Sequence, residues 1–295
     1  MTHINAADTF SGPDPEAQRV LNGRDIRLLV CDVDGTLVDS EDRISPRVAA
    51  RMEEAVERGV TICLASGRPH RAMLPVLKQV PLTTPVISSG GANLYDPVTE
   101  QFLMHHTLPS RAVDCILAAG RDAGVSLLFE FPHAMKLEGD PAEAAKLSER
   151  IDFEVQVVPD MEPVITEMPT KIVLIGGDAA LLHLELELTS SCPNVYIARS
   201  MADFLDFTAA GVNKGSALKA LSAHLGIPLT QTAAIGDSPN DQSMLQLANL
   251  NACVQNAHPA LHRNADLITP SNEESGVAWL LEQVFHHQNG RHPHI

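Results

Sequence analysis

Apolar and polar residues alternate along the first part of the chain in a way that predicts strands and helices in turn. Residues 27–33 form a nearly continuous apolar run, which is typical of a parallel strand covered on both faces. A helix is predicted over 46–58, because proline opens it and glycine follows it. Two further strands are predicted over 60–66 and 85–89. Such an alternation indicates βαβ units and an open parallel sheet.

The same alternation returns near the C-terminus. The elements predicted there are helices over 213–227, 240–248 and 275–287 and strands over 232–237 and 251–256. We therefore predict an α/β fold with a Rossmann-like, doubly wound parallel sheet at its core.

A different pattern fills the segment between these two parts. Helices are predicted near 110–123, 141–150 and 178–190, and strands over 126–131, 154–158, 171–176 and 194–198. Helices separated by paired strands indicate an α+β module inserted between the third and fourth core strands. The predicted domains are a core of residues 25–91 and 206–287, a cap of residues 92–205, and flexible tails of residues 1–24 and 288–295.

Composition excludes several classes of protein. The chain has 295 residues, is 44% hydrophobic and 20% charged, and carries a formal net charge of −16. That charge argues against binding to nucleic acid or to an anionic membrane, since both need basic surfaces. The five cysteines are scattered and contain no CxxC pair, so neither a disulfide framework nor a structural zinc site is expected. The N-terminus lacks the basic start and apolar centre of a signal peptide, and a reduced cytoplasmic location is predicted.

Polar residues cluster where the predicted strands end. Asp32 and Asp34 lie at the end of the first strand, Ser66 ends the second, and Asp237 ends a later strand, with Asp241 four residues on. Two carboxylates as close as Asp32 and Asp34 are either solvated in an ordinary turn or share a cation. Ligands of open α/β sheets bind beyond the carboxyl ends of the strands, so we expect these groups to converge.

The residue types present at these strand ends suit phosphoryl transfer. A carboxylate can act as a covalent nucleophile, and a second one can protonate the leaving oxygen and then activate water. Oxygen ligands from several carboxylates suit Mg²⁺. Ser66 and Lys214, at the start of a predicted helix, can hold the oxygens of a transferring phosphoryl group.

The order and spacing of these motifs resemble those of one family. "DVDGTL" from Asp32, "LASGRP" around Ser66, the helix that begins at Lys214 and "IGDSPND" around Asp237 resemble the four motifs of the haloacid dehalogenase (HAD) superfamily of phosphatases. The inserted segment resembles the type II cap of its Cof-like branch, subfamily IIB. The resemblance covers about residues 27–285.

The resemblance implies a catalytic role for each acidic residue. Asp32 would be the nucleophile and a Mg²⁺ ligand. Asp34 would be the general acid and base, with its backbone carbonyl on the metal. Asp237 would be the third protein ligand of Mg²⁺. Asp241 would act through a metal-bound water or by orienting Lys214, although Asp237 and Asp241 could also be helix caps.

The resemblance also implies a set of contacts to the phosphate. These come from Val33, Ser66, Gly67, Lys214 and Asn240. Arg68 either faces the substrate or is an exposed helix charge.

One departure from the family's pattern concerns the segment after the third strand. The Cof-like branch has an Asn-Gly pair there, whereas this chain has Gly90 at the Asn position, and Asn93 is a candidate substitute. This departure puts substrate contacts near the domain junction in doubt.

The predicted function is Mg²⁺-dependent hydrolysis of a small phosphorylated metabolite, such as a sugar phosphate, through an aspartyl-phosphate. A phosphomutase or phosphotransferase, which passes the phosphoryl group to a sugar hydroxyl, is the alternative within enzymes. A non-catalytic protein that senses a phosphorylated metabolite is the alternative of another class. The chain is expected to be a monomer or a homodimer.

Overall fold

The computed structural model describes residues 12–80, 82–192 and 194–291 of the chain. Its contacts divide the protein into two compact units. The first unit comprises Met1–Ala65, Val76–Val86 and Leu218–Ile295, and the second comprises Ser66–Pro75 and Ile87–Ala217. The predicted cap, 92–205, lies inside the second unit, which also contains residues 66–75, 87–91 and 206–217 that the prediction placed in the core.

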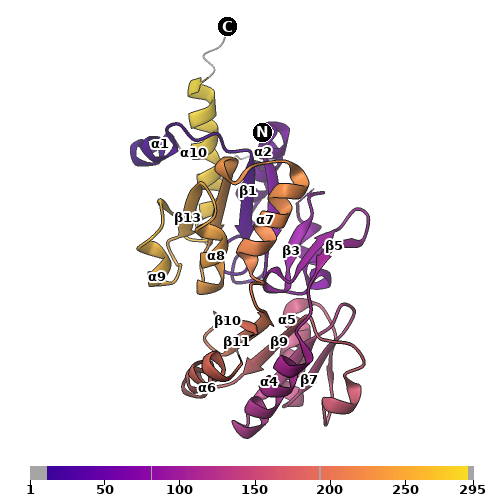
Figure 1. The fold of residues 1–295 in the computed structure, drawn as a ribbon. Coiled ribbons are helices and arrows are strands. Elements are labelled where there is room, and N and C mark those ends of the chain that lie inside the picture. The colour runs from indigo at the N-terminus through magenta and orange to yellow at the C-terminus, as the bar shows by residue number, and fades with distance from the viewer. Residues whose placement is uncertain (1–11, 81, 193, 292–295) are drawn as a thin grey trace. The chain divides into compact units, whose positions relative to one another are not determined.

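Parallel strands form the sheet of the first unit (Figure 1). In spatial order they are β14 (Leu267–Thr269), β13 (Leu250–Val254), β12 (Thr232–Gly236), β1 (Leu28–Asp32) and β2 (Thr61–Ala65). Every residue of β1 and β12 is buried, as expected for strands with both faces covered. The chain leaves β1 toward β2 and later returns on the other side of β1 through β12. The boundary between β1 and β12 is therefore the topological switch point of a doubly wound sheet.

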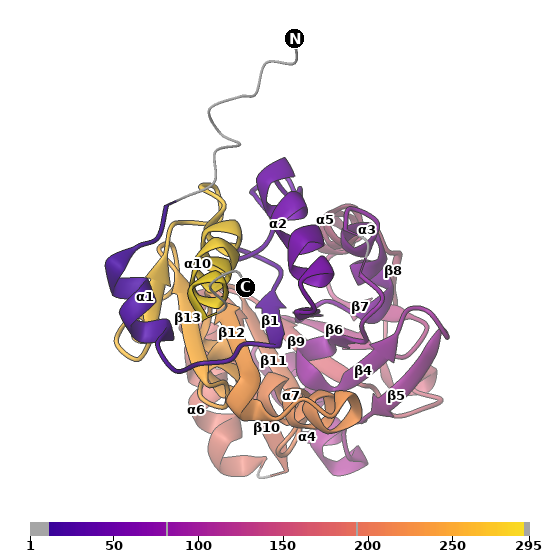
Figure 2. The same ribbon diagram turned by 90° about the horizontal axis from the view of Figure 1, so that it is seen from above.

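Three helices of the first unit pack together: α1 (Pro15–Leu21), α2 (Pro46–Glu57) and α10 (Gly276–Arg291). Helix α10 contacts both α1 and α2, and Figure 2 shows it between them. The short helices α8 (Gln242–Leu245) and α9 (Pro259–His262) follow β12 and β13, and α8 contacts both of these strands.

Helix α1 lies within the segment 1–24 that was predicted to be a flexible tail, and that prediction is wrong for Pro15–Leu21. The Asp14 carboxylate caps the helix by accepting hydrogen bonds from the amides of Glu16 and Ala17, at 2.9 Å each. Residues 1–11 of the predicted tail lie outside the described part of the chain. At the other end α10 continues to Arg291, past the predicted end at 287, and residues 292–295 lie outside the described part.

A six-stranded sheet forms the centre of the second unit. Its spatial order is β10 (Val195–Met201), β11 (Phe204–Ala209), β9 (Lys171–Ile175), β6 (Ser126–Glu130), β7 (Met135–Glu138) and β8 (Val155–Val157). Only β7 and β8 pair in parallel, and the other neighbours with a described register are antiparallel. Paired, mainly antiparallel strands agree with the α+β module predicted for this segment.

Both faces of the six-stranded sheet are covered by helices. Helices α4 (Ser110–Asp122) and α6 (Asp178–Ser191) contact each other and share one apolar core with Phe129, Leu174 and Phe207. On the other face Leu128 and Val173 pack with residues of α5 (Pro141–Ile151). Successive residues of β6 and β9 alternate between the two cores, as the pleat of a strand requires.

Short turns and one hairpin are the remaining elements of the second unit. They are the 3₁₀ turns His70–Met73, Ser89–Gly91 and Glu162–Val164 and the antiparallel hairpin of β4 (Asn93–Asp96) and β5 (Gln101–His105). Strand β3 (Val86–Ser88) and helices α3 (Leu74–Leu77) and α7 (Lys214–Leu225) span the boundaries between the units. The first unit also contains 3₁₀ turns at Leu229–Gln231 and Pro239–Asp241. Among the described residues no helix is long and apolar enough to cross a membrane. The predicted fold class, an α/β core with an inserted α+β module, is confirmed.

Candidate active site

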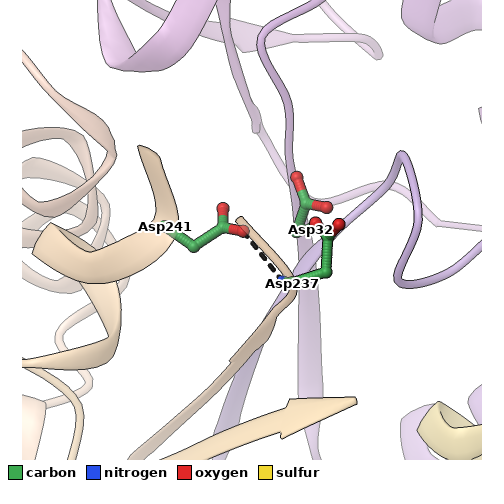
Figure 3. Close-up of side chains that lie close together, drawn as sticks. All are labelled: Asp32, Asp237 and Asp241. Atoms are coloured by element: carbon green, nitrogen blue, oxygen red, sulfur yellow. Dashed lines mark hydrogen bonds between the residues drawn. The ribbon is translucent and has the colours of Figure 1, made fainter. Parts of the chain in front are cut away.

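Three carboxylates lie close together in the first unit, at the carboxyl ends of β1 and β12 (Figure 3). Asp32, Asp237 and Asp241 each offer one oxygen, and these oxygens lie within 4.8 Å of one another. Asp32 and Asp241 are buried, and Asp237 is half-buried. Like charges at this range disfavour the ionised form of each other unless a cation lies near them. The cluster is therefore a candidate cation site.

Strand order brings these carboxylates together. Strands β1 and β12 are adjacent and parallel, with Cys31 opposite Ile235. Asp32 is the last residue of β1, and Asp237 follows directly after β12. Their carboxylates thus meet at the switch point of the sheet, where ligands of doubly wound folds bind.

Asp241 shapes the loop that carries Asp237. Its Oδ2 atom accepts hydrogen bonds from the amides of Asp237 and Ser238, each at 3.0 Å. The Asp241 amide donates in return to the Ser238 carbonyl at 2.9 Å. At Gly236 a Cβ would lie 2.6 Å from Asp241 Cγ, so only glycine lets this carboxylate approach the strand end. Asp241 is a cap of the turn that follows β12, in addition to being a member of the cluster.

A tight turn follows Asp32 and presents Asp34, which is half-buried. The Leu37 amide closes the turn by donating to the Val33 carbonyl at 2.9 Å. Gly35 takes a φ of +77°, and a Cβ there would lie 2.6 Å from Asp237 Oδ2. The Thr36 hydroxyl donates toward Asp237 Oδ1 at 3.5 Å. The turn after β1 thus packs against the aspartate after β12.

The donor atoms of the cluster suit Mg²⁺. All are carboxylate oxygens, which hard divalent cations prefer, and the cluster contains neither sulfur nor imidazole. The sequence assigned Asp32, Asp34 and Asp237 to the metal, with Asp34 acting through its backbone carbonyl. The side-chain cluster contains Asp241 and does not contain the Asp34 carboxylate, so a ligand role for Asp34 stays a prediction that concerns its carbonyl alone.

The serine predicted to contact phosphate lies in the second unit, in a loop fixed by backbone hydrogen bonds. Ser66 follows Ala65, the residue opposite Asp32 in the pairing of β1 with β2. The Ser66 amide donates to the Ile87 carbonyl at 2.9 Å, and the Arg68 amide donates to Ser66 Oγ at 3.0 Å. The Arg68 side chain is buried, so the alternative of an exposed helix charge is wrong.

Lys214 is the first residue of α7 and is only 1% exposed. The turn before it is capped, because the Ser216 amide donates to Asn213 Oδ1 at 2.9 Å and the Asn213 amide donates to Ser216 Oγ at 3.0 Å. At Gly91, with a φ of +101°, a Cβ would lie 2.2 Å from the Asn213 carbonyl oxygen. Glycine is therefore required at position 91 for the Ser89–Gly91 turn to lie against the residues that precede α7. A buried ammonium at a helix N-terminus opposes the helix dipole, which favours an anionic ligand beside it.

The other predicted phosphate contacts are divided between the units. Val33 and Asn240 belong to the first unit, and Asn240 Oδ1 accepts a hydrogen bond from Ser238 Oγ at 2.6 Å. Gly67 belongs to the second unit with Ser66, Arg68 and Lys214.

Residue Asn93, the candidate substitute for the missing asparagine, is buried, and its Nδ2 donates to Ser89 Oγ at 2.9 Å. Ser89 in turn donates to Glu130, and both belong to a buried polar network with Lys171 and Asp206. The sequence did not predict this network. The sequence feature that could have indicated the network is a charged residue at one end of each of two buried strands. Glu130 is the last residue of β6, and Lys171 is the first residue of β9.

The family of haloacid dehalogenase-like hydrolases matches residues 29–281 of the chain. An HMP-PP phosphatase of Cronobacter sakazakii is 30% identical over 239 residues, which cover 80% of this chain and 86% of that protein. A 5-amino-6-(5-phospho-D-ribitylamino)uracil phosphatase of Bacillus subtilis is 25% identical over 271 residues, which cover 88% and 97%. Among solved structures, a sugar phosphatase of HAD subclass IIB superimposes with a TM-score of 0.79 at 25% identity, covering 88% of this chain and 99% of that one.

The chain belongs to the haloacid dehalogenase-like hydrolase family. The family match, the phosphatase relatives and the acidic cluster at the switch point agree with one another, and the predicted enzyme class, a HAD phosphatase, is confirmed.

Proposed function

We propose that the protein is a Mg²⁺-dependent phosphatase that hydrolyses a small phosphomonoester through a phosphorylated aspartate. The observation that carries the proposal is the cluster of Asp32, Asp237 and Asp241 at the switch point, in a chain of this family. Aspartates that only solvate ordinary turns would not be expected to cluster from segments about 200 residues apart in the sequence.

In the first half of the reaction, a carboxylate oxygen of Asp32 attacks phosphorus and the bond from phosphorus to the ester oxygen breaks. Asp34 donates its proton to the leaving oxygen, so the alcohol departs neutral. In the second half, Asp34 takes a proton from water as the water oxygen attacks phosphorus. The bond from phosphorus to Asp32 breaks, which releases inorganic phosphate and restores both side chains.

The phosphate is held by groups that donate hydrogen bonds. We assign this role to the Val33 amide, Ser66 with Gly67, Lys214 and Asn240, with Arg68 as a further cation. These donors would lie against the equatorial oxygens of the phosphoryl group, where negative charge is spread in the transition state.

Mg²⁺ would be held by Asp32, Asp237 and the Asp34 carbonyl. When bound, it supplies charge neutralisation that lets a carboxylate approach an anionic phosphate. Asp241 fixes the loop that positions Asp237, and in the proposal it also orients Lys214.

For substrate class, we propose a phosphorylated sugar or a related small metabolite. The relatives act on HMP-PP, on 5-amino-6-(5-phospho-D-ribitylamino)uracil and on sugar phosphates, by their names. A cytoplasmic location and a monomeric or homodimeric state remain predictions.

The test is hydrolysis of p-nitrophenyl phosphate and of a panel of sugar, nucleotide and cofactor phosphates, with Mg²⁺ and with a chelator. We expect Mg²⁺-dependent release of phosphate that Asp32→Asn abolishes. Asp39→Asn is the matched control, because Asp39 caps a neighbouring turn, with its Oδ1 accepting from the Glu41 and Arg43 amides, and has no role in the proposed chemistry. Transfer of the phosphoryl group to a sugar without phosphate release would favour the phosphotransferase alternative. Tight binding of one ester without turnover would favour the regulator.

A further inference from the structure

One end of the six-stranded sheet carries a buried group of charges. Glu130, the last residue of β6, lies opposite Lys171, the first residue of β9. Asp206, on β11 next to β9, lies on the same face. Lys171 Nζ is 3.8 Å from Glu130 Oε2 and 3.9 Å from Asp206 Oδ1. All three side chains are at most 10% exposed.

This charged sheet end meets the loop that carries Ser66. Lys171 Nζ donates a hydrogen bond to the Gly67 carbonyl oxygen at 2.6 Å. The neighbouring loop meets it as well, because the Ser89 hydroxyl donates to Glu130 Oε1. The two loops are joined to each other, since the Ser89 amide donates to the Arg68 carbonyl at 2.8 Å.

The Gly67 carbonyl and the Arg68 amide belong to one planar peptide unit, and they point in opposite directions. Lys171 holds the oxygen of this unit, while its N–H donates to Ser66 Oγ at 3.0 Å. Through this hydrogen bond the peptide unit holds Ser66 Oγ as an acceptor, so the orientation of the unit bears on the direction in which the Ser66 hydroxyl can donate. Gly67 has no Cβ, so its own sterics restrict rotation of the unit less than another residue would, and hydrogen bonds at the two ends of the unit add to the restraint.

Burial makes the arrangement electrostatically demanding. Two carboxylates share one ammonium, and burial raises the pKa of Glu130, while Lys171 opposes that effect. Charges buried in this way need partners with good geometry, because removing one partner leaves another uncompensated. Unlike an apolar side chain, the ammonium gives the contact between sheet and loop a direction, because it donates a hydrogen bond to the Gly67 carbonyl.

We propose that Lys171 is a positioning residue that sets the orientation of the Gly67–Arg68 peptide and thereby presents the Ser66 hydroxyl as a hydrogen-bond donor to phosphate. This inference rests on the proposed function, since it deepens the role assigned to Ser66. Lys171 touches neither the substrate nor the metal in this account.

The test combines Lys171→Met with Glu130→Gln, so that the buried group keeps its net charge while the donor to Gly67 is lost. Arg121→Met is the matched control. Arg121 also binds several carboxylates in the second unit, at 2.6 Å from Glu138 and 2.9 Å from Glu162, but contacts neither loop. We expect the double variant to raise KM for p-nitrophenyl phosphate and the inhibition constant of inorganic phosphate about tenfold, as for other residues that orient a ligand-binding group. The control should change neither constant.

A double-mutant cycle with Ser66→Ala separates positioning from general stability. In the wild-type background Ser66→Ala should weaken phosphate inhibition about tenfold, and in the double-variant background it should have little further effect. Full additivity in folded, active variants would overturn the inference and leave the proposed function standing.

A second readout does not depend on activity. Hydrogen exchange of the Arg68 amide should be faster in the double variant than in the wild type and the Arg121 control. Unchanged exchange would overturn the inference. A wild-type protein without activity on any phosphate ester would defeat the proposed function, while the exchange comparison would still decide whether Lys171 holds the peptide.

Discussion

Replacing Gly35 by alanine should separate the chemistry of the site from the stability of the fold. Gly35 has a φ of +77°, and a Cβ there would lie 2.6 Å from Asp237 Oδ2 and 3.1 Å from Asp237 Cγ. Gly59 offers a matched control. Its φ is +80°, but a Cβ there would meet nothing within 4 Å. Both variants carry the same backbone penalty, and only Gly35→Ala adds a contact with the carboxylate.

The backbone penalty for a left-handed alanine is about 1–2 kcal/mol, so both variants should lose about that much free energy of unfolding. At Gly35 the clash is with a side-chain oxygen, and relieving it requires Asp237 or the turn to move by several tenths of an ångström or more. Displacement of about 1 Å within a catalytic site costs on the order of 100-fold in rate. Gly35→Ala should therefore lower kcat/KM about 100-fold and weaken the dependence on Mg²⁺, while Gly59→Ala leaves both unchanged.

Urea unfolding gives the stability of each variant, and hydrolysis of p-nitrophenyl phosphate over a range of Mg²⁺ concentrations gives the kinetics. Equal kinetics for the two alanine variants would refute the inference that Gly35 keeps space for Asp237. Loss of activity in Gly59→Ala as large as in Gly35→Ala would show that stability, rather than the position of Asp237, limits the reaction.

Three further predictions follow from the packing and charges of the described residues. Asp241→Ala removes an acceptor of two amide hydrogen bonds and should lower the free energy of unfolding by roughly 3 kcal/mol. Asp241→Asn keeps an acceptor and should lower it less. Equal losses for the two variants in urea unfolding would contradict this prediction. Burial lowers the pKa of His70 from 6.5 to about 4, so the unfolded chain binds more protons than the folded protein between these pH values. The free energy of unfolding should therefore fall by roughly 3 kcal/mol at most as the pH drops from about 6.5 to 4. His70→Leu should reduce this fall, as measured by unfolding curves at pH 7 and pH 4.5. Phe207→Ala should destabilise the second unit by about 3–5 kcal/mol because Phe207 is fully buried, and an unchanged thermal midpoint would exclude a tight core there.

The strength of the local signal decided which elements were predictable from the sequence. Strands β1 and β9 each contain four consecutive apolar residues, and both strands were predicted. Strand β7, "MKLE", is too short for its alternation of apolar and charged residues to stand out, and it was missed. The hairpin that β7 forms with β6 was therefore missed as well. Helix α1 was missed although "DPEAQRVL" contains a capping aspartate, proline in the first turn and an acidic first turn. A search for caps would have found it.

For the candidate site, the sequence could indicate residues that follow strands but not how separate strands pair. It placed Asp32 and Asp237 at strand ends, and parallel pairing of β1 with β12 then brings them together. It offered Asp241 as a cap and as a helper in the site, and Asp241 does cap the turn after β12, since its carboxylate accepts from the Asp237 and Ser238 amides. The hydrogen bond from Lys171 to Gly67 joins residues 104 positions apart. It could not be predicted without knowing how the strands of the second unit pair.

Phosphorylation of Asp32 is the most direct test of the account. The measurement uses Asp34→Asn, Mg²⁺ and p-nitrophenyl phosphate, whose leaving group departs without a proton from the enzyme. We predict a burst of about one nitrophenolate per protein molecule, followed by slow turnover, because the base that activates water is missing. Acid quenching and peptide mass spectrometry should then find one phosphoryl group on the peptide that contains Asp32. A variant that shows neither burst nor phosphorylated peptide, while the wild-type protein hydrolyses the same ester, would contradict the account.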